Sequence, residues 1–95
     1  NNEKFIIDLL KIDAEGEDLK ILKGCNFLLK KNKIKLIKIE LLNTFNQKNI
    51  SNLNEIIFFL QKYNYYLVTI TKTKFVNEEL LMMDAYFCKK KFFNN

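Results

Sequence analysis

The sequence predicts an α/β fold in which two parallel strands joined by a crossover helix are followed by another helix and an antiparallel hairpin. Two apolar segments, 5–14 and 34–42, have the length of strands and contain similar patterns, Leu-Leu-Lys-Ile-Asp and Leu-Ile-Lys-Ile-Glu. The segment between them has helical periodicity and about the length that a parallel crossover requires. Two further strand-like segments with a short link between them favour the hairpin.

The first strand, 5–14, has apolar residues on both of its faces, which is typical of a strand covered on both sides. Lys11 and Asp13 lie on one face near its end. A charge within a sheet is energetically unfavourable unless it is paired with an opposite charge or serves a function. Because ligands of open α/β sheets bind beyond the carboxyl ends of the strands, this end of the strand is the first candidate for a functional site.

The crossover begins at a tight turn, where Gly16 is most simply explained by backbone geometry. Glu17 and Asp18 follow, and acids in the first turn of a helix complement its dipole. Gly24 weakens the helical segment, so we expect the helix to stop there and to restart at Asn26.

The second half of the chain begins with a polar loop and a helix whose apolar stripe starts at Leu53. Asn64 can end this helix in a left-handed conformation. Segments 66–71 and 80–89 are predicted strands, and the residues between them are predicted to be a connection. We expect the tail, 90–95, to be frayed.

The two apolar strands carry charged residues at equivalent positions. If the strands are neighbours, Asp13, Glu15 and Glu40 gather at one edge of the sheet, with Lys11 and Lys38 one layer below. Crossovers of this kind are right-handed almost without exception. The sequence therefore predicts an acidic patch at the carboxyl ends of two parallel strands.

The 95 residues suffice for one small domain. We expect this domain, 1–95, to be a partial one, since the sequence begins with Asn rather than Met. The longest apolar runs are too short for a membrane helix, and no signal-peptide pattern opens the chain. These features predict a cytoplasmic location and no membrane partner.

The net charge of +5 arises from lysines alone, without any arginine. Base readout in nucleic-acid complexes relies on arginine forks, so a solvated lysine surface is the preferred interpretation of this charge. A basic nucleic-acid-binding module is kept as an alternative, which steep salt dependence of binding would reveal.

Several chemistries are excluded by residue types that the chain lacks. It contains no His, which removes every Ser-His-Asp or Cys-His scheme. Cys25 and Cys88 are too few and too far apart for a zinc site or a disulfide framework, and we expect reduced thiols. With only Gly16 and Gly24, neither a phosphate loop nor a Gly-x-Gly-x-x-Gly turn can be formed.

The block from Leu10 to Gly24, Leu-Lys-Ile-Asp-Ala-Glu-Gly-Glu-Asp-Leu-Lys-Ile-Leu-Lys-Gly, resembles the FkbM family of S-adenosylmethionine-dependent methyltransferases. The second strand, which ends Leu-Ile-Lys-Ile-Glu at Glu40, also fits that family's pattern. The resemblance implies a Rossmann-like sheet of which this chain supplies the C-terminal portion. It places the glycine-rich turn and the ribose-binding acid in an N-terminal half outside this sequence.

The resemblance implies transfer of a methyl group from S-adenosylmethionine, usually to an oxygen. Asp13 would lie beside both cofactor and acceptor, and its alternative is a pair with Lys11 or a helix cap. Glu15 is an acceptor-site carboxylate or only a capping residue. Glu40 completes the acidic patch or pairs with Lys38. Carboxylates alone do not establish a divalent metal, so no metal ligand is assigned.

Three functional hypotheses follow from these observations. The first is part of a methyltransferase that acts on a small-molecule or glycan acceptor once joined to its N-terminal half. The second is a degenerate domain that serves in binding or assembly. The third is the nucleic-acid-binding module. A cofactor-binding turn upstream of Asn1 would favour the first hypothesis over the second.

Overall fold

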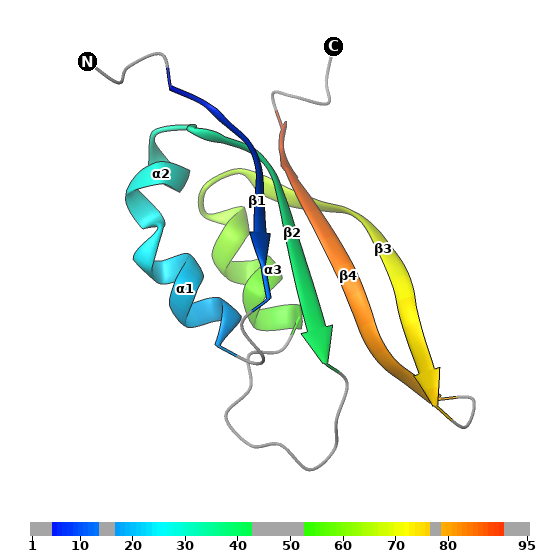
Figure 1. Cartoon of the computed structure of the whole chain (residues 1–95). Helices are drawn as coiled ribbons and strands as arrows, with labels where there is room; N and C mark the ends of the chain where they lie inside the picture. Colours follow the sequence, from blue (N-terminus) through cyan, green and yellow to red (C-terminus); the bar gives the residue numbers. More distant parts are fainter. Residues whose placement is uncertain (1–4, 14–16, 43–52, 77–78, 91–95) are drawn as a thin grey trace.

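The structure is a computed structural model that describes residues 5–13, 17–42, 53–76 and 79–90. Within these residues, four strands form one mixed sheet in the order β1-β2-β4-β3 (Figure 1). The strands are β1 (Ile7–Ile12), β2 (Ile34–Leu42), β3 (Tyr65–Val76) and β4 (Glu79–Lys89). β1 and β2 are parallel, and β4 is antiparallel to both β2 and β3. The predicted parallel pair and antiparallel hairpin are confirmed.

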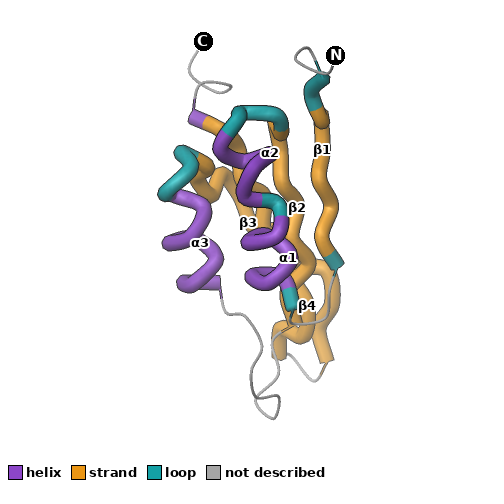
Figure 2. Tube along the Cα trace, turned by 90° about the vertical axis from the view of Figure 1, so that its left-hand side faces the viewer, coloured by secondary structure: helices purple, strands orange, loops and turns teal. Residues whose placement is uncertain are grey.

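The described helices all lie on the same face of this sheet (Figure 2). They are α1 (Asp18–Gly24), α2 (Asn26–Lys30) and α3 (Leu53–Gln61). The first two form the crossover between β1 and β2, and the third leads into β3. None of them is long and apolar enough to cross a membrane. The opposite face of the sheet, called the open face below, carries no described helix.

The crossover helix is interrupted where the sequence predicts. Cys25 separates α1 from α2, and its backbone N–H donates hydrogen bonds to the carbonyl oxygens of Ile21 (3.1 Å) and Leu22 (3.0 Å). Asn64, beyond the end of α3, has a φ of 65°. The predicted left-handed residue is therefore confirmed, in a region of conformational space that Asn tolerates better than most residues.

The hairpin strands are longer than the sequence indicates. β3 continues to Val76 and β4 begins at Glu79, so much of the predicted connection is paired backbone. Residues 72–76 have the pattern Lys-Thr-Lys-Phe-Val. Its lysines are uncommon in strands, so the sequence pattern does not indicate a strand although Thr, Phe and Val are strand-forming residues. β3 is an edge strand of the described sheet, where lysines are favourable because they oppose pairing with other chains.

The tail also differs from its prediction at its first residue. The backbone N–H of Lys90 donates a 3.0 Å hydrogen bond to the carbonyl oxygen of Asn64. This bond ties the end of β4 to the turn that follows α3. Residues 91–95 lie outside the described part of the chain.

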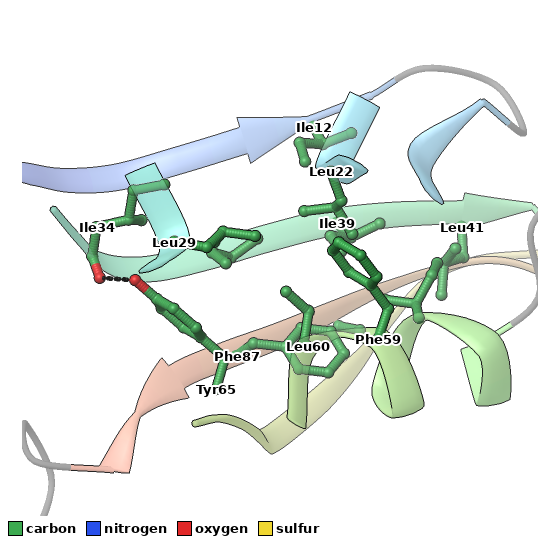
Figure 3. Packing of buried hydrophobic residues seen from close by; sticks show 13 residues of the cluster. Ile12, Leu22, Leu29, Ile34, Ile39, Leu41, Phe59, Leu60, Tyr65 and Phe87 are labelled. Carbon is green, nitrogen blue, oxygen red and sulfur yellow. Dashed lines mark hydrogen bonds between the residues drawn. The ribbon is translucent and has the colours of Figure 1, made fainter. Parts of the chain in front are cut away.

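The core lies between the sheet and the helices (Figure 3). On β2 the alternate residues Ile37, Ile39 and Leu41 face the helices, with at most 3% of their surface exposed. They pack with buried side chains from the helices and from β4, which include Leu22, Leu29, Ile56, Leu60, Ala85 and Phe87. Because side chains alternate along a strand, Lys38 and Glu40 must project from the open face.

Two buried polar side chains make hydrogen bonds at one end of the sheet, and Lys89 joins it to the helix layer. The buried Tyr65 hydroxyl donates a 2.5 Å hydrogen bond to the carbonyl oxygen of Ile34, at the start of β2. The buried Lys89 ammonium donates to the carbonyl oxygens of Leu29 (3.3 Å) and Tyr63 and lies 4.6 Å from the centre of the Tyr65 ring. A cation near the last carbonyls of a helix is also favoured by the helix dipole.

We expect Tyr65→Phe to lower the free energy of unfolding by about 1 kcal/mol, the usual net contribution of one hydrogen bond. Burial raises the pKa of Tyr65 to about 12. The unaltered chain should therefore keep this contribution below pH 10 and lose it as the pH rises through about 12. Urea unfolding followed by circular dichroism measures both effects.

Tyr63→Phe is the matched control, because the Tyr63 ring is only partly buried and packs against Phe59. A loss of stability as large as that of Tyr65→Phe would contradict the assigned importance of the Tyr65 hydrogen bond.

Candidate functional site

Two rows of charged side chains cross the open face of the sheet near the carboxyl ends of β1 and β2. The acidic row consists of Asp13, Glu40 and Asp84, and the basic row consists of Lys11 and Lys38. Lys11 is the register partner of Lys38, and Glu40 is the register partner of Asp84. Asp13 directly follows Ile12, the partner of Ile39, and so lies beside Glu40. Three adjacent strands thus bring three carboxyl groups into one line.

Glu40 is the central member of the acidic row. Burial raises the pKa of its carboxyl, and so do a side-chain hydrogen bond with Asp13 and the charges of Asp13 and Asp84, whereas Lys11 lowers it. Glu40 is partly buried and Asp13 is exposed. Asp13 and Glu40 thus form a pair of adjacent carboxyl groups at the ends of two parallel strands. A carboxyl group beside another carboxyl group is harder to ionise, which agrees with the raised pKa of Glu40.

Lys38 belongs to an ion pair with Asp84. The Lys38 Nζ lies 3.8 Å from the Asp84 Oδ2, and these side chains are 25% and 9% exposed. The same ammonium lies 5.8 Å from the centre of the Tyr86 ring. The sequence left open that Lys38 pairs with Glu40. In the structure the ion-pair partner of Lys38 is Asp84 of β4.

The residues predicted from the sequence are only partly tested by this geometry. Asp13 and Glu40 come together as expected, with Lys11 and Lys38 in the neighbouring layer. Glu15 and Gly16 lie outside the described residues, and the roles given to them stay predictions. The catalytic role of Asp13 and Glu40, and cofactor binding by Asp13, also stay predictions.

Asp84 was not among the residues predicted from the sequence. It is buried, with 7% of its surface exposed, and comes from the middle of β4. A single acid inside an apolar strand is the same signal that singles out Asp13. That signal could have found Asp84, but only the strand order β1-β2-β4-β3 places it next to Glu40.

A separate groove lies between α1 and α3, away from the acidic row. Its volume is about 200 Å³, and it is lined by Leu19, Lys23, Glu55, Phe58, Phe59 and Lys62. Sites for small molecules usually enclose about 300–1,000 Å³, so this groove is small for such a role. Among the described residues, no group of three or more metal-ligating side chains is arranged to hold a metal ion.

The acidic row lies at the carboxyl ends of the two parallel strands, which is where open α/β sheets bind their ligands. The family model of the methyltransferase FkbM domain matches residues 1–67, which is more than half of the chain. The chain therefore belongs to the FkbM methyltransferase domain family. The matched residues include Asp13 and Glu40 but not Asp84. No curated protein and no solved structure matches the chain.

We expect Glu40→Gln to stabilise the fold at pH 7, because it removes a carboxylate that faces other carboxylates. The gain should be roughly 0.2–1 kcal/mol, the range for charge pairs across strands. The raised pKa of Glu40 means that its ionisation opposes folding as the pH rises above 4.5. The gain should therefore vanish near pH 4, which urea unfolding at several pH values would measure.

Glu17→Gln provides the control, because Glu17 is exposed and pairs with Lys20 at 3.3 Å. It should bring no gain in stability. If Glu40→Gln destabilises the chain at pH 7, the electrostatic description of the acidic row is wrong.

Proposed function

We propose that this chain forms the acceptor side of an S-adenosylmethionine-dependent methyltransferase that methylates a hydroxyl oxygen. The membership of the FkbM methyltransferase domain family supports the methyltransferase part of this proposal. The single observation that carries the choice of a hydroxyl acceptor is the Asp13–Glu40 carboxyl pair. A hydroxyl group must lose a proton when its oxygen is methylated, and a carboxylate is a suitable proton acceptor.

The chemistry of the acidic row fits the cofactor. S-adenosylmethionine, when bound, supplies a methyl group attached to a positively charged sulfur. Asp13 is exposed at the end of β1, so its carboxylate can attract a positive charge outside the sheet. Asp13 would thus hold the charged part of the cofactor, while other groups of the cofactor would be held by residues outside this chain.

Asp13 and Glu40 would act on the acceptor together. The acceptor hydroxyl would donate a hydrogen bond to a carboxylate of the pair, which orients the oxygen lone pair for in-line attack. Its proton would pass to that carboxylate as the new oxygen–carbon bond forms, while the electron pair of the O–H bond stays on oxygen. General-base catalysis of this kind contributes about 10²–10⁴-fold to a rate.

The proposal includes an N-terminal half of the domain that pairs with β1. β1 is parallel to β2 but lies at the edge of the described sheet, with Leu9 48% exposed. Parallel strands usually have both faces covered, and a free apolar edge favours pairing with another strand. In this proposal the four strands form the C-terminal portion of a Rossmann-like sheet.

The acceptor is proposed to be a small molecule or a glycan. The cations nearest the acidic row do not favour an anionic polymer, because Lys38 is already paired with Asp84. Nucleic acid and membrane partners are therefore not part of the proposal. The cytoplasmic location stays a prediction from the sequence.

We expect Asp13→Asn to lower the turnover of the complete enzyme by about 100-fold or more, because it removes the anion that would hold the charged part of the cofactor and one member of the carboxyl pair that would act on the acceptor. The assay is the release of the demethylated cofactor product in the presence of a panel of hydroxyl compounds. Asp8→Asn is the control, because Asp8 is an exposed partner of Lys35 and should leave turnover unchanged. An unimpaired rate in Asp13→Asn would remove Asp13 from the mechanism.

We expect the 95-residue chain alone to show no measurable affinity for S-adenosylmethionine. It has only two glycines, and a glycine-rich turn that could receive the cofactor cannot be formed from them. Isothermal titration calorimetry tests this expectation. Tight binding would show that the cofactor site lies within these residues and that the proposed division between two halves is wrong.

A further inference from the structure

Asp84 is the most buried of the three carboxyl groups in the acidic row. It is 7% exposed, yet the ammonium of Lys38 lies 3.8 Å from its Oδ2. A buried charge is usually paired, and the ion pair with Lys38 supplies that partner. The pair lies directly beside Glu40, because Asp84 is the register partner of Glu40 on β2.

We propose that Asp84, fixed by Lys38, is a positioning residue that raises the basicity of Glu40, the central member of the acidic row. The use of Glu40 as a base in catalysis rests on the proposed function. The distribution of charge around Glu40 is a property of the described strands and does not depend on the proposed function. Neither Asp84 nor Lys38 needs to touch the acceptor.

The groups that face Glu40 come from each neighbouring strand. β1 and the residue after it contribute Lys11 and Asp13, β2 contributes Lys38, and β4 contributes Asp84. Thr71 of β3, the register partner of Asp84, is uncharged. Glu40 thus has one carboxyl group beside it on each neighbouring strand and two lysines in the adjacent row.

The three carboxyl groups of the acidic row differ in their surroundings. Asp13 is exposed to water, and Asp84 is paired with the Lys38 ammonium. Glu40 lies between them, partly buried, with a carboxylate on either side. The direction of its shift agrees with this arrangement, because burial, Asp13 and Asp84 all raise the pKa of Glu40.

This arrangement makes Glu40 a stronger base than an ordinary carboxylate. A general base works best when its pKa lies near the operating pH, so raising the pKa of Glu40 favours proton removal from a hydroxyl. The proton of the acceptor O–H group would pass to the Glu40 carboxylate, and the bonding electrons would remain on the acceptor oxygen. Asp84 would act only by setting the basicity of Glu40.

The test is a titration of the chain with ¹³C-labelled Glu and Asp carboxyl groups, followed by NMR. In the unaltered chain Glu40 should titrate above 4.5, and in Asp84→Asn its midpoint should fall toward 4.5. Asp84→Glu keeps the charge and should keep the raised midpoint. Asp8→Asn is the matched control and should leave Glu40 unchanged, because Asp8 belongs to the separate pair with Lys35.

An unchanged Glu40 midpoint in Asp84→Asn would overturn the inference. If Asp84→Asn does not fold, Asp84→Ser removes the same charge with a smaller side chain and is judged by the same criterion. The pH dependence of turnover in the complete enzyme separates this inference from the proposed function. A midpoint that falls without a matching shift of the acid limb of turnover would reject Glu40 as the proton acceptor, while the positioning role of Asp84 would stand.

Discussion

The candidate site depends on the parallel pairing of β1 with β2 in a single register. Ile12 lies opposite Ile39, which places Asp13 beside Glu40 and Lys11 beside Lys38. A slip of one residue would turn Lys38 and Glu40 of β2 toward the helices and expose Ile37 and Ile39. The apolar face of β2 thus fixes the register, although the charged groups lie on the opposite face of this strand.

Tyr65 and Lys89 make buried polar contacts at the end of the sheet far from the acidic row. Tyr65 bonds to the start of β2, while Lys89 bonds to the end of α2 and to the turn after α3. A Lys is rarely buried without partners, and here two carbonyl groups and an aromatic ring surround its ammonium. The Tyr65 bond thus joins β3 to β2, which are separated in the sheet by β4, and the Lys89 bonds join β4 to the helix layer.

The sequence predicted the parts of the fold that depend on local pattern. The apolar alternation of 34–42, the break near Gly24 and the left-handed Asn64 each follow from properties of a few neighbouring residues. The extent of β3 could not be predicted in this way. The lysines of 72–76 favour a loop locally, whereas pairing with β4 makes the segment a strand.

The residues of the candidate site could likewise be predicted only where their placement depends on neighbouring parts of the sequence. Asp13 and Glu40 could be predicted together because parallel strands joined by one crossover are commonly neighbours. Asp84 is 44 residues further along the chain than Glu40, as their numbers show, and its place depends on β4 inserting between β2 and β3. No local pattern in β4 specifies that insertion.

The electrostatics of the acidic row favour function over stability as its explanation. On the same open face, the residues beyond the basic row are Leu9, Leu36 and Cys88, so an uncharged surface is compatible with this sheet. Ion-pair networks also shift pKa values, but they lower those of acids. The pKa of Glu40 is raised, largely by burial and by neighbouring carboxyl groups. Carboxyl groups placed so that they raise the pKa of a neighbour do not stabilise the fold, and this is the physical ground on which a functional role is proposed for the acidic row.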